Sequence, residues 1–292
     1  MEKIKVVLDW FPNNIHVGFL LSQVRGFYRY AGIDLELEGD VHGVMETDGM
    51  DFVCGPQASM LENMANGADI LGIGQLTYIQ DSGLISLKDA NIERPKDLEG
   101  KRLTHWAPKW FHLMIDRLVK EDGGNPALIE KVAMDVEHPQ EVLGETADAI
   151  WIYKNWEYYV MKQENKDCNF IEIANYGHPF DYPTPAMAVR GELWRKNPDL
   201  VKRFMLATEK GYQAAVSEGV KVIPEIRHLL PEVEDAILYN GLEHLLPRFL
   251  DKNGHWGNLN VEAWESLLDF FLESGIYGHS YPERTYIGSF RD

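Results

Sequence analysis

Strand and helix patterns alternate along the chain, and this limits it to an α/β fold. Apolar residues alternate over positions 4–10, which predicts a strand, and recur at helical spacing over 17–27, which predicts a helix. Gly32 is placed to cap that helix, and positions 34–37 predict a second strand. The next predicted elements are a strand at 50–54, a helix at 57–66 and a strand at 69–73. This order is typical of an open, mostly parallel sheet.

The chain also contains two predicted crossings between lobes. After Gly83 it turns polar through 92–101, and a new series of strands and helices begins at Arg102. That series comprises a helix at 110–119, a strand at 147–152, a helix around Trp156 and a strand at 169–173. The prolines of Tyr182-Pro183-Thr184-Pro185 exclude a helix and predict a return crossover into a strand at 186–190. Further helices are predicted at 198–215, 220–230, 234–246 and 261–274.

We therefore expect an α/β protein of two lobes. One lobe is made of residues 1–85 and 186–292, and the other of residues 86–185. Two crossovers near 83–98 and 183–186 would form a hinge that closes a cleft around a small molecule.

Composition narrows the class of partner. The 292 residues include 28 Lys and Arg against 46 Asp and Glu, a formal net charge of −18, which disfavours nucleic acid and anionic membranes. Cys54 and Cys168 are far apart and the ten histidines are scattered, so we expect no disulfide and no metal site. P-loop, HExxH, GxSxG and EF-hand motifs are absent, so we assign no cofactor and no catalytic residue.

Polar and aromatic residues follow the first predicted strand. Trp10 offers a stacking face, while Asp9, Asn13 and His16 offer polar edges. Ligands bind at the carboxyl ends of strands in open α/β sheets, so these four residues are candidate ligand contacts. The alternative is that Trp10 packs in the core and Asn13 only caps the helix.

A second candidate group follows a strand of the other lobe. Tyr153, Trp156 and their neighbours would stack on a flat heterocycle, and Glu157 would accept hydrogen bonds from the amino group of that heterocycle. Asn155, in the same segment, is a further candidate contact. The alternative is that these aromatic rings pack between helix and sheet.

Five further candidates come from other segments. The small residues Gly55 and Pro56 open a helix at Gln57 and would expose backbone N–H groups, although an ordinary turn explains them equally well. Trp106 follows another strand, and Tyr182 lies in the return crossover.

A resemblance to a known family runs over nearly the whole chain. The residues that carry it are Leu8-Asp9-Trp10, Pro12-Asn13, His16-Val17-Gly18, Arg25-Gly26-Phe27-Tyr28, Asp97-Leu98-Glu99-Gly100-Lys101, Asn155-Trp156-Glu157 and Trp256-Gly257. The chain resembles the NMT1/THI5-like proteins, which implies the type 2 periplasmic-binding-protein fold with two hinge crossovers. The binding members of the family take formylaminopyrimidines or related heterocycles for ABC importers, which implies stacking by Trp10 with Asn13 and His16 nearby.

The resemblance therefore implies a monomeric solute-binding protein for a thiamine pyrimidine precursor, with an ABC transporter permease as its candidate partner. Its place of action would be extracytoplasmic, periplasmic or lipid-anchored, if an export signal has been removed, and cytoplasmic if Met1 is the native start. The stretch between Glu38 and Asp51 is shorter than is usual in the family, so the ligand itself could differ.

The same family holds the fungal enzyme that makes the thiamine pyrimidine from pyridoxal phosphate and a histidine. Aligned with that enzyme, Gly55 replaces its Schiff-base lysine, Ser59 replaces its donor histidine, and no cysteine cluster follows Tyr182. We therefore expect a binding protein. The alternatives are an enzyme that uses Lys109 or Lys154, and a cytosolic sensor of a heterocycle.

Overall fold

The computed structural model divides the chain into two compact units. It describes residues 1–39, 49–105, 108–134, 136, 138–278 and 280–291. Unit 1 consists of Met1–Ile79 and Tyr182–Asp292, and unit 2 of Gln80–Asp181. The chain leaves unit 1 once and returns to it once. The sequence placed the same two crossings a few residues later, after positions 85 and 185.

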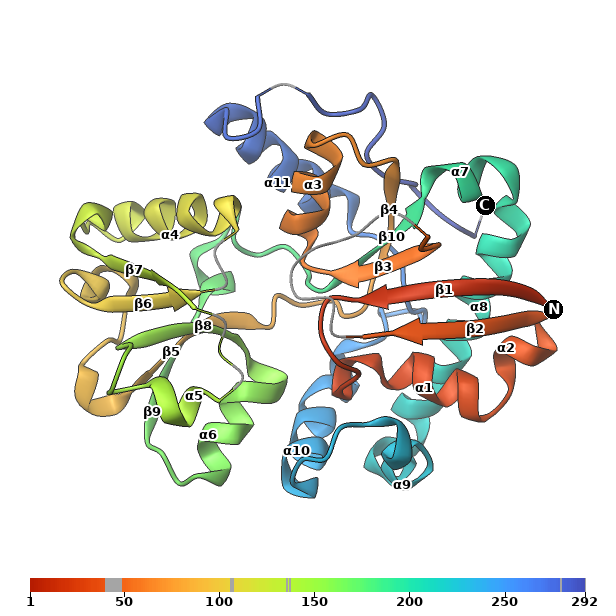
Figure 1. The fold of residues 1–292 in the computed structure, drawn as a ribbon, viewed down its shortest axis with the longest axis horizontal. Coiled ribbons are helices and arrows are strands. Elements are labelled where there is room, and N and C mark those ends of the chain that lie inside the picture. The colour runs from red at the N-terminus through yellow and green to blue at the C-terminus, as the bar shows by residue number, and fades with distance from the viewer. Residues whose placement is uncertain (40–48, 106–107, 135, 137, 279, 292) are drawn as a thin grey trace. The chain divides into compact units, whose positions relative to one another are not determined.

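Unit 1 is built on a five-stranded sheet (Figure 1). Its strands, in order across the sheet, are β2 (Ile33–Glu38), β1 (Glu2–Leu8), β3 (Phe52–Gly55), β10 (Ala186–Arg190) and β4 (Ile70–Gln75). β1 runs parallel to β2 and β3, whereas β10 runs antiparallel to β3 and β4. β10 is reversed because it enters the sheet directly from the return crossover, at the edge where β3 and β4 end.

Helices cover both faces of this sheet (Figure 1). They are α1 (Val17–Val24), α2 (Phe27–Tyr30) and α8 (Pro198–Glu218) on one face, with α3 (Gln57–Ala65) and α11 (Val261–Ser274) on the other. On the first face the rings of Phe52 and Phe204 lie 4.2 Å apart. On the second, Trp264 packs so closely over β4 that a Cβ at Gly72 would lie 2.5 Å from its indole. Both faces of the sheet are therefore tightly packed.

The remaining helices of unit 1 are α7 (Gly191–Lys196), α9 (Ile223–Ile226) and α10 (Asp235–Leu245). The helix predicted over 220–230 is helical in the structure but is divided into three short pieces. 3₁₀ turns at Gly219–Val222 and Arg227–Leu229 flank the short α9, which has Pro224 in its first turn. Proline is favoured there and disrupts a helix that would extend through it.

Two glycines allow α1 and α8 to approach each other. A Cβ at Gly18 would lie 2.0 Å from the ring of Tyr212, and one at Gly211 would lie 2.0 Å from the carbonyl oxygen of Gly18. The buried Tyr212 hydroxyl donates a hydrogen bond to the carbonyl oxygen of Ile15 at 2.7 Å. This contact ties the short helix η1 (Asn14–His16), which follows β1, to α8.

Unit 2 has its own five-stranded sheet (Figure 1). Its strands are, in order, β7 (Glu130–Ala133), β6 (Arg102–His105), β8 (Ala149–Tyr153), β5 (Ser82–Leu87) and β9 (Cys168–Glu172). α4 (Lys109–Glu121) covers one face, and α5 (Pro139–Val142) and α6 (Tyr159–Gln163) cover the other.

Each sheet is mixed through a single reversed strand, β10 in unit 1 and β5 in unit 2, so the prediction of a mostly parallel sheet is confirmed. In unit 2, β5 runs antiparallel to β8 and β9, while β6 runs parallel to β7 and β8. The sequence analysis predicted no strand at β5, although Ser82, Ser86 and the apolar residues between them are buried. In the described part of the chain, no helix combines the length and apolar character needed to cross a bilayer.

Candidate ligand-binding site

The loop after β1 is held in place by its own hydrogen bonds. The Asn13 side-chain oxygen accepts from the backbone N–H of Ile15 at 3.1 Å, and the Asn13 backbone N–H donates to Nδ1 of His16 at 3.2 Å. The Asn13 amide nitrogen also donates to the carbonyl oxygen of Phe11. The capping role predicted for Asn13 is thus confirmed, and this turn fixes the residues before and after it.

His16 presents an N–H group to its surroundings. Because Nδ1 accepts a hydrogen bond, the neutral ring carries its hydrogen on Nε2. The residue is 1% exposed, and burial lowers its pKa to about 3, so the ring is neutral at physiological pH. Within the described residues, Nε2 is buried and has no hydrogen-bond partner. His16 is therefore a hydrogen-bond donor of fixed tautomer.

Asp9 is the first residue after β1, and its backbone N–H donates to the carbonyl oxygen of Cys54 at 3.1 Å. Its carboxyl group lies beside Gly55, where a Cβ would come within 3.3 Å of Oδ2. Burial raises the pKa of Asp9 to about 7. The residue nevertheless keeps part of its surface exposed. The carboxyl is thus crowded by protein yet accessible to a ligand.

Trp10 does not join the core of unit 1. It keeps intermediate exposure, and its ring lies 3.8 Å from that of Phe11, tilted by 36°. Gly39, directly after β2, lets this loop lie close, since a Cβ there would be 2.8 Å from Cδ of Pro12. The alternative of a fully buried Trp10 is wrong, and part of its surface remains available for stacking.

The β3–α3 junction and the end of β4 add two amide groups at the same edge of the sheet. Pro56 provides no side-chain cap for α3, and Gln57, its first residue, is 2% exposed. Gln75 ends β4, and its Oε1 accepts from the backbone N–H of Asn260 at 2.9 Å. Across the described chain, Nε2 of each glutamine is buried without a hydrogen-bond partner. Both amides are therefore available as N–H donors.

The strand register explains why these groups share one edge. Ala186 pairs with Gly55 on one side and with Gln75 on the other, and Leu8 pairs with Cys54. The sequence analysis missed Gln75. It is a polar residue at the end of a predicted strand, so the criterion that selected Asp9 would have found it.

In unit 2, the second candidate group lies at the end of β8. Residues Lys154–Tyr158 form a π-helical turn, a feature that often marks functional sites. The Asn155 backbone N–H donates to Oδ2 of the buried Asp81 at 3.0 Å, and Glu157 Oε2 accepts from the Tyr153 backbone N–H at 3.2 Å. Trp156 is 4% exposed, so its ring packs in the core as the alternative predicted.

The other predicted contacts are placed as follows. Trp106 lies outside the described residues. Tyr182, 3% exposed, stands in unit 1 shortly before β10.

Comparison with models of known protein families identifies the family of this chain. The model described as NMT1/THI5 like matches residues 13–220. The chain belongs to the NMT1/THI5-like family. The match includes Asn13, His16, the β3–α3 junction and the π-helical turn.

Known members and solved structures agree with this assignment. The NMT1/THI5-like chain is 20% identical to a formylaminopyrimidine-binding protein of Halalkalibacterium halodurans, over 92% of this chain and 84% of that protein. It is 23% identical to a 4-amino-5-hydroxymethyl-2-methylpyrimidine phosphate synthase of Legionella pneumophila, over 85% and 80%. The periplasmic aliphatic sulphonate binding protein SsuA from Escherichia coli superposes with a TM-score of 0.74 at 12% identity, covering 100% of both chains. The fold is thus the two-lobed type 2 periplasmic-binding-protein fold.

Neither candidate lysine of this NMT1/THI5-like chain has the setting that Schiff-base chemistry requires. Lys109 is exposed. Lys154 forms an ion pair with Glu172 and lies 5.8 Å and 5.1 Å from the ring centres of Tyr158 and Phe170. A buried, unpaired amine would be needed to lower a lysine pKa for that reaction.

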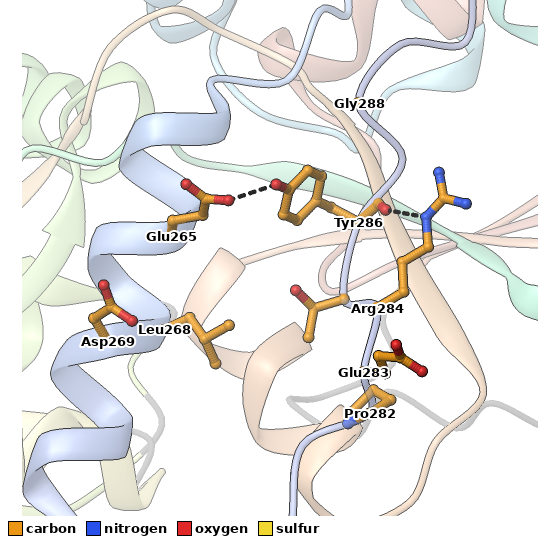
Figure 2. A pocket seen from close by; sticks show the side chains of 9 residues that line it. Glu265, Leu268, Asp269, Pro282, Glu283, Arg284, Tyr286 and Gly288 are labelled. Atoms are coloured by element: carbon orange, nitrogen blue, oxygen red, sulfur yellow. Dashed lines mark hydrogen bonds between the residues drawn. The ribbon is translucent and has the colours of Figure 1, made fainter.

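A separate hollow of about 420 Å³ lies between α11 and the C-terminal segment (Figure 2). Glu265, Asp269 and Glu283 line it together with Arg284. The Tyr286 hydroxyl donates to Oε1 of Glu265 at 2.5 Å, so part of the lining is already paired. The acidic lining alone does not define a ligand.

Proposed function

We propose that the chain is a solute-binding protein for an aminopyrimidine-type heterocycle, a precursor of the thiamine pyrimidine. The proposal rests first on its similarity to a formylaminopyrimidine-binding protein across 92% of the chain. The fold that it shares with SsuA is that of a binding protein.

The observation that carries the proposal is the pairing of an aromatic face with a carboxyl group at the end of β1. Trp10 keeps an accessible surface, and the adjacent Asp9 carboxyl makes no hydrogen bond or ion pair with another described side chain. A flat amino-heterocycle presents both a face to stack and an edge to hydrogen-bond. His16 and Gln57 add N–H donors for its acceptor atoms.

We further propose that the protein delivers this ligand to an ABC importer and acts outside the cytoplasm as a monomer. The support is the similarity in fold to a periplasmic protein, SsuA.

Calorimetric titration with 4-amino-5-hydroxymethyl-2-methylpyrimidine and its formylaminomethyl relative tests the proposal. We expect micromolar or tighter binding, a free energy of about −8 kcal/mol or better. Trp10→Ala should weaken it roughly 10- to 100-fold, because stacking on an aromatic side chain contributes about 1–3 kcal/mol.

The matched control is Tyr30→Ala, which removes an aromatic ring that is 87% exposed on α2. It should bind like the wild type. If neither pyrimidine binds while an alkanesulfonate does, the ligand assignment is wrong. Equal weakening by both substitutions would contradict the role given to Trp10.

A further inference from the structure

Asp9 is an ionisable group whose neighbour on β3, Cys54, is uncharged. Cys54 on β3 interacts with Asp9, and Tyr28 on α2 and Tyr212 on α8 interact in turn with Cys54, while His16 lies on η1, which follows β1. Burial raises the pKa of the Cys54 thiol and of both tyrosine hydroxyls, and it lowers the pKa of His16, so all four are uncharged near neutral pH. In the described part of the chain, no lysine or arginine offsets a negative charge on Asp9.

At Gly55, the close approach of the backbone leaves no room for a side chain that could pair with the Asp9 carboxyl. Gly55 faces the carboxyl without a side chain, and a Cβ there would lie 3.2 Å from Cβ of Asp9. The backbone N–H of Asp9 itself is used by the carbonyl oxygen of Cys54. The residue remains partly exposed, so a ligand or a proton can reach it.

The protonation state of Asp9 decides which ligand edge fits. An ionised carboxylate only accepts hydrogen bonds, whereas a carboxylic acid donates one and accepts another. An aminopyrimidine edge also has one of each, because a ring nitrogen accepts beside an amino group that donates. The acid form is therefore the complement of that edge, with its O–H on the ring nitrogen and its C=O on the amino group.

We propose that Asp9 binds the amino-heterocycle as a carboxylic acid, so that ligand binding at alkaline pH takes up one proton. This inference rests on the proposed function and makes Asp9 the residue that determines specificity. The proton comes from the solvent and is held between the Asp9 oxygen and the ring nitrogen. Burial, which raises the pKa of Asp9 to about 7, makes this form accessible near neutrality.

Asparagine provides a stringent test because its amide also presents one donor and one acceptor but does not titrate. We would titrate the wild type and Asp9→Asn with 4-amino-5-hydroxymethyl-2-methylpyrimidine from pH 6 to 9. Each pH would be run in two buffers of different ionisation enthalpy, and the ligand's own titration would be measured separately. The difference in heat between the buffers gives the number of protons taken up.

For the wild type, we expect the Kd to rise about tenfold per pH unit above pH 7, with uptake of about one proton. Asp9→Asn should lose both the uptake and the pH dependence, and at pH 9 it should bind at least about tenfold more tightly than the wild type. Asp34→Asn, which changes an exposed residue on β2, should behave like the wild type.

Binding without proton uptake in the wild type, or with the same pH dependence in Asp9→Asn, would overturn the inference and leave the proposed function intact. No binding by either protein at any pH would reject the proposed function, and the inference with it. If Asp9→Asn fails to fold, the wild type alone tests the inference: uptake of about one proton on binding supports it, and binding without uptake overturns it.

Discussion

Glu209, in the middle of α8, links the C-terminal segment to unit 1. It is 6% exposed, and Arg291 donates to both of its oxygens, at 3.0 Å and 2.8 Å. The backbone N–H of Trp256 donates to the same carboxylate at 3.1 Å, and Nδ1 of His255 lies 3.1 Å from it. Four contacts therefore converge on one buried charge.

Substitution Glu209→Gln keeps the shape of this side chain and removes its charge. Arg291, whose side chain is 23% exposed, would lose the charge of its partner and keep three neutral acceptors: the amide oxygen of the new glutamine, the carbonyl oxygen of Trp256 and Oδ1 of Asn258. Removing one partner of a buried ion pair costs about 3–5 kcal/mol. Since Arg291 retains some exposure and neutral acceptors, we expect a loss of about 3 kcal/mol in the free energy of unfolding.

Urea unfolding followed by tryptophan fluorescence measures this loss, because Trp256 is fully buried beside the pair. The matched control is Glu192→Gln, whose carboxylate pairs with Lys196 and Arg190 at the surface. Exposed ion pairs contribute about 0–1 kcal/mol to stability, so Glu192→Gln should change the free energy of unfolding by no more than that. If Glu209→Gln costs no more than Glu192→Gln, the reasoning about burial is refuted.

Two further predictions concern the stability of the unliganded protein. Gly18→Ala should lower the free energy of unfolding by roughly 1–3 kcal/mol through its clash with Tyr212, whereas Gly288→Ala, where space is open, should be nearly neutral in thermal unfolding. Asp9→Asn should stabilise the protein above pH 7 by up to about 4 kcal/mol, since the raised pKa of Asp9 makes its ionisation unfavourable in the fold. This gain should vanish below about pH 4, where the carboxyl is protonated in both states; a gain that does not change with pH would contradict it.

Local patterns in the sequence determined most of the elements. Hydrophobic periodicity reports which residues face a core, so α4, α8, α11 and the strands β1, β3 and β8 could be predicted from it. The prolines before β10 marked the return crossover because they exclude a helix whatever surrounds them. The position of Asp9 and Trp10 at the end of a strand followed from the same local reasoning.

Only the tertiary structure decided how those elements pair and how their side chains behave. Strand direction depends on where the chain re-enters a sheet, so β5 and β10 emerged as antiparallel partners without a local signal. The raised pKa of Asp9 arises from burial by segments distant in sequence, including Gly55. The role of Gln75 depended likewise on the backbone of Asn260, 185 residues away. Periodicity is encoded within a few residues, whereas desolvation and hydrogen-bond partners are properties of the assembled fold.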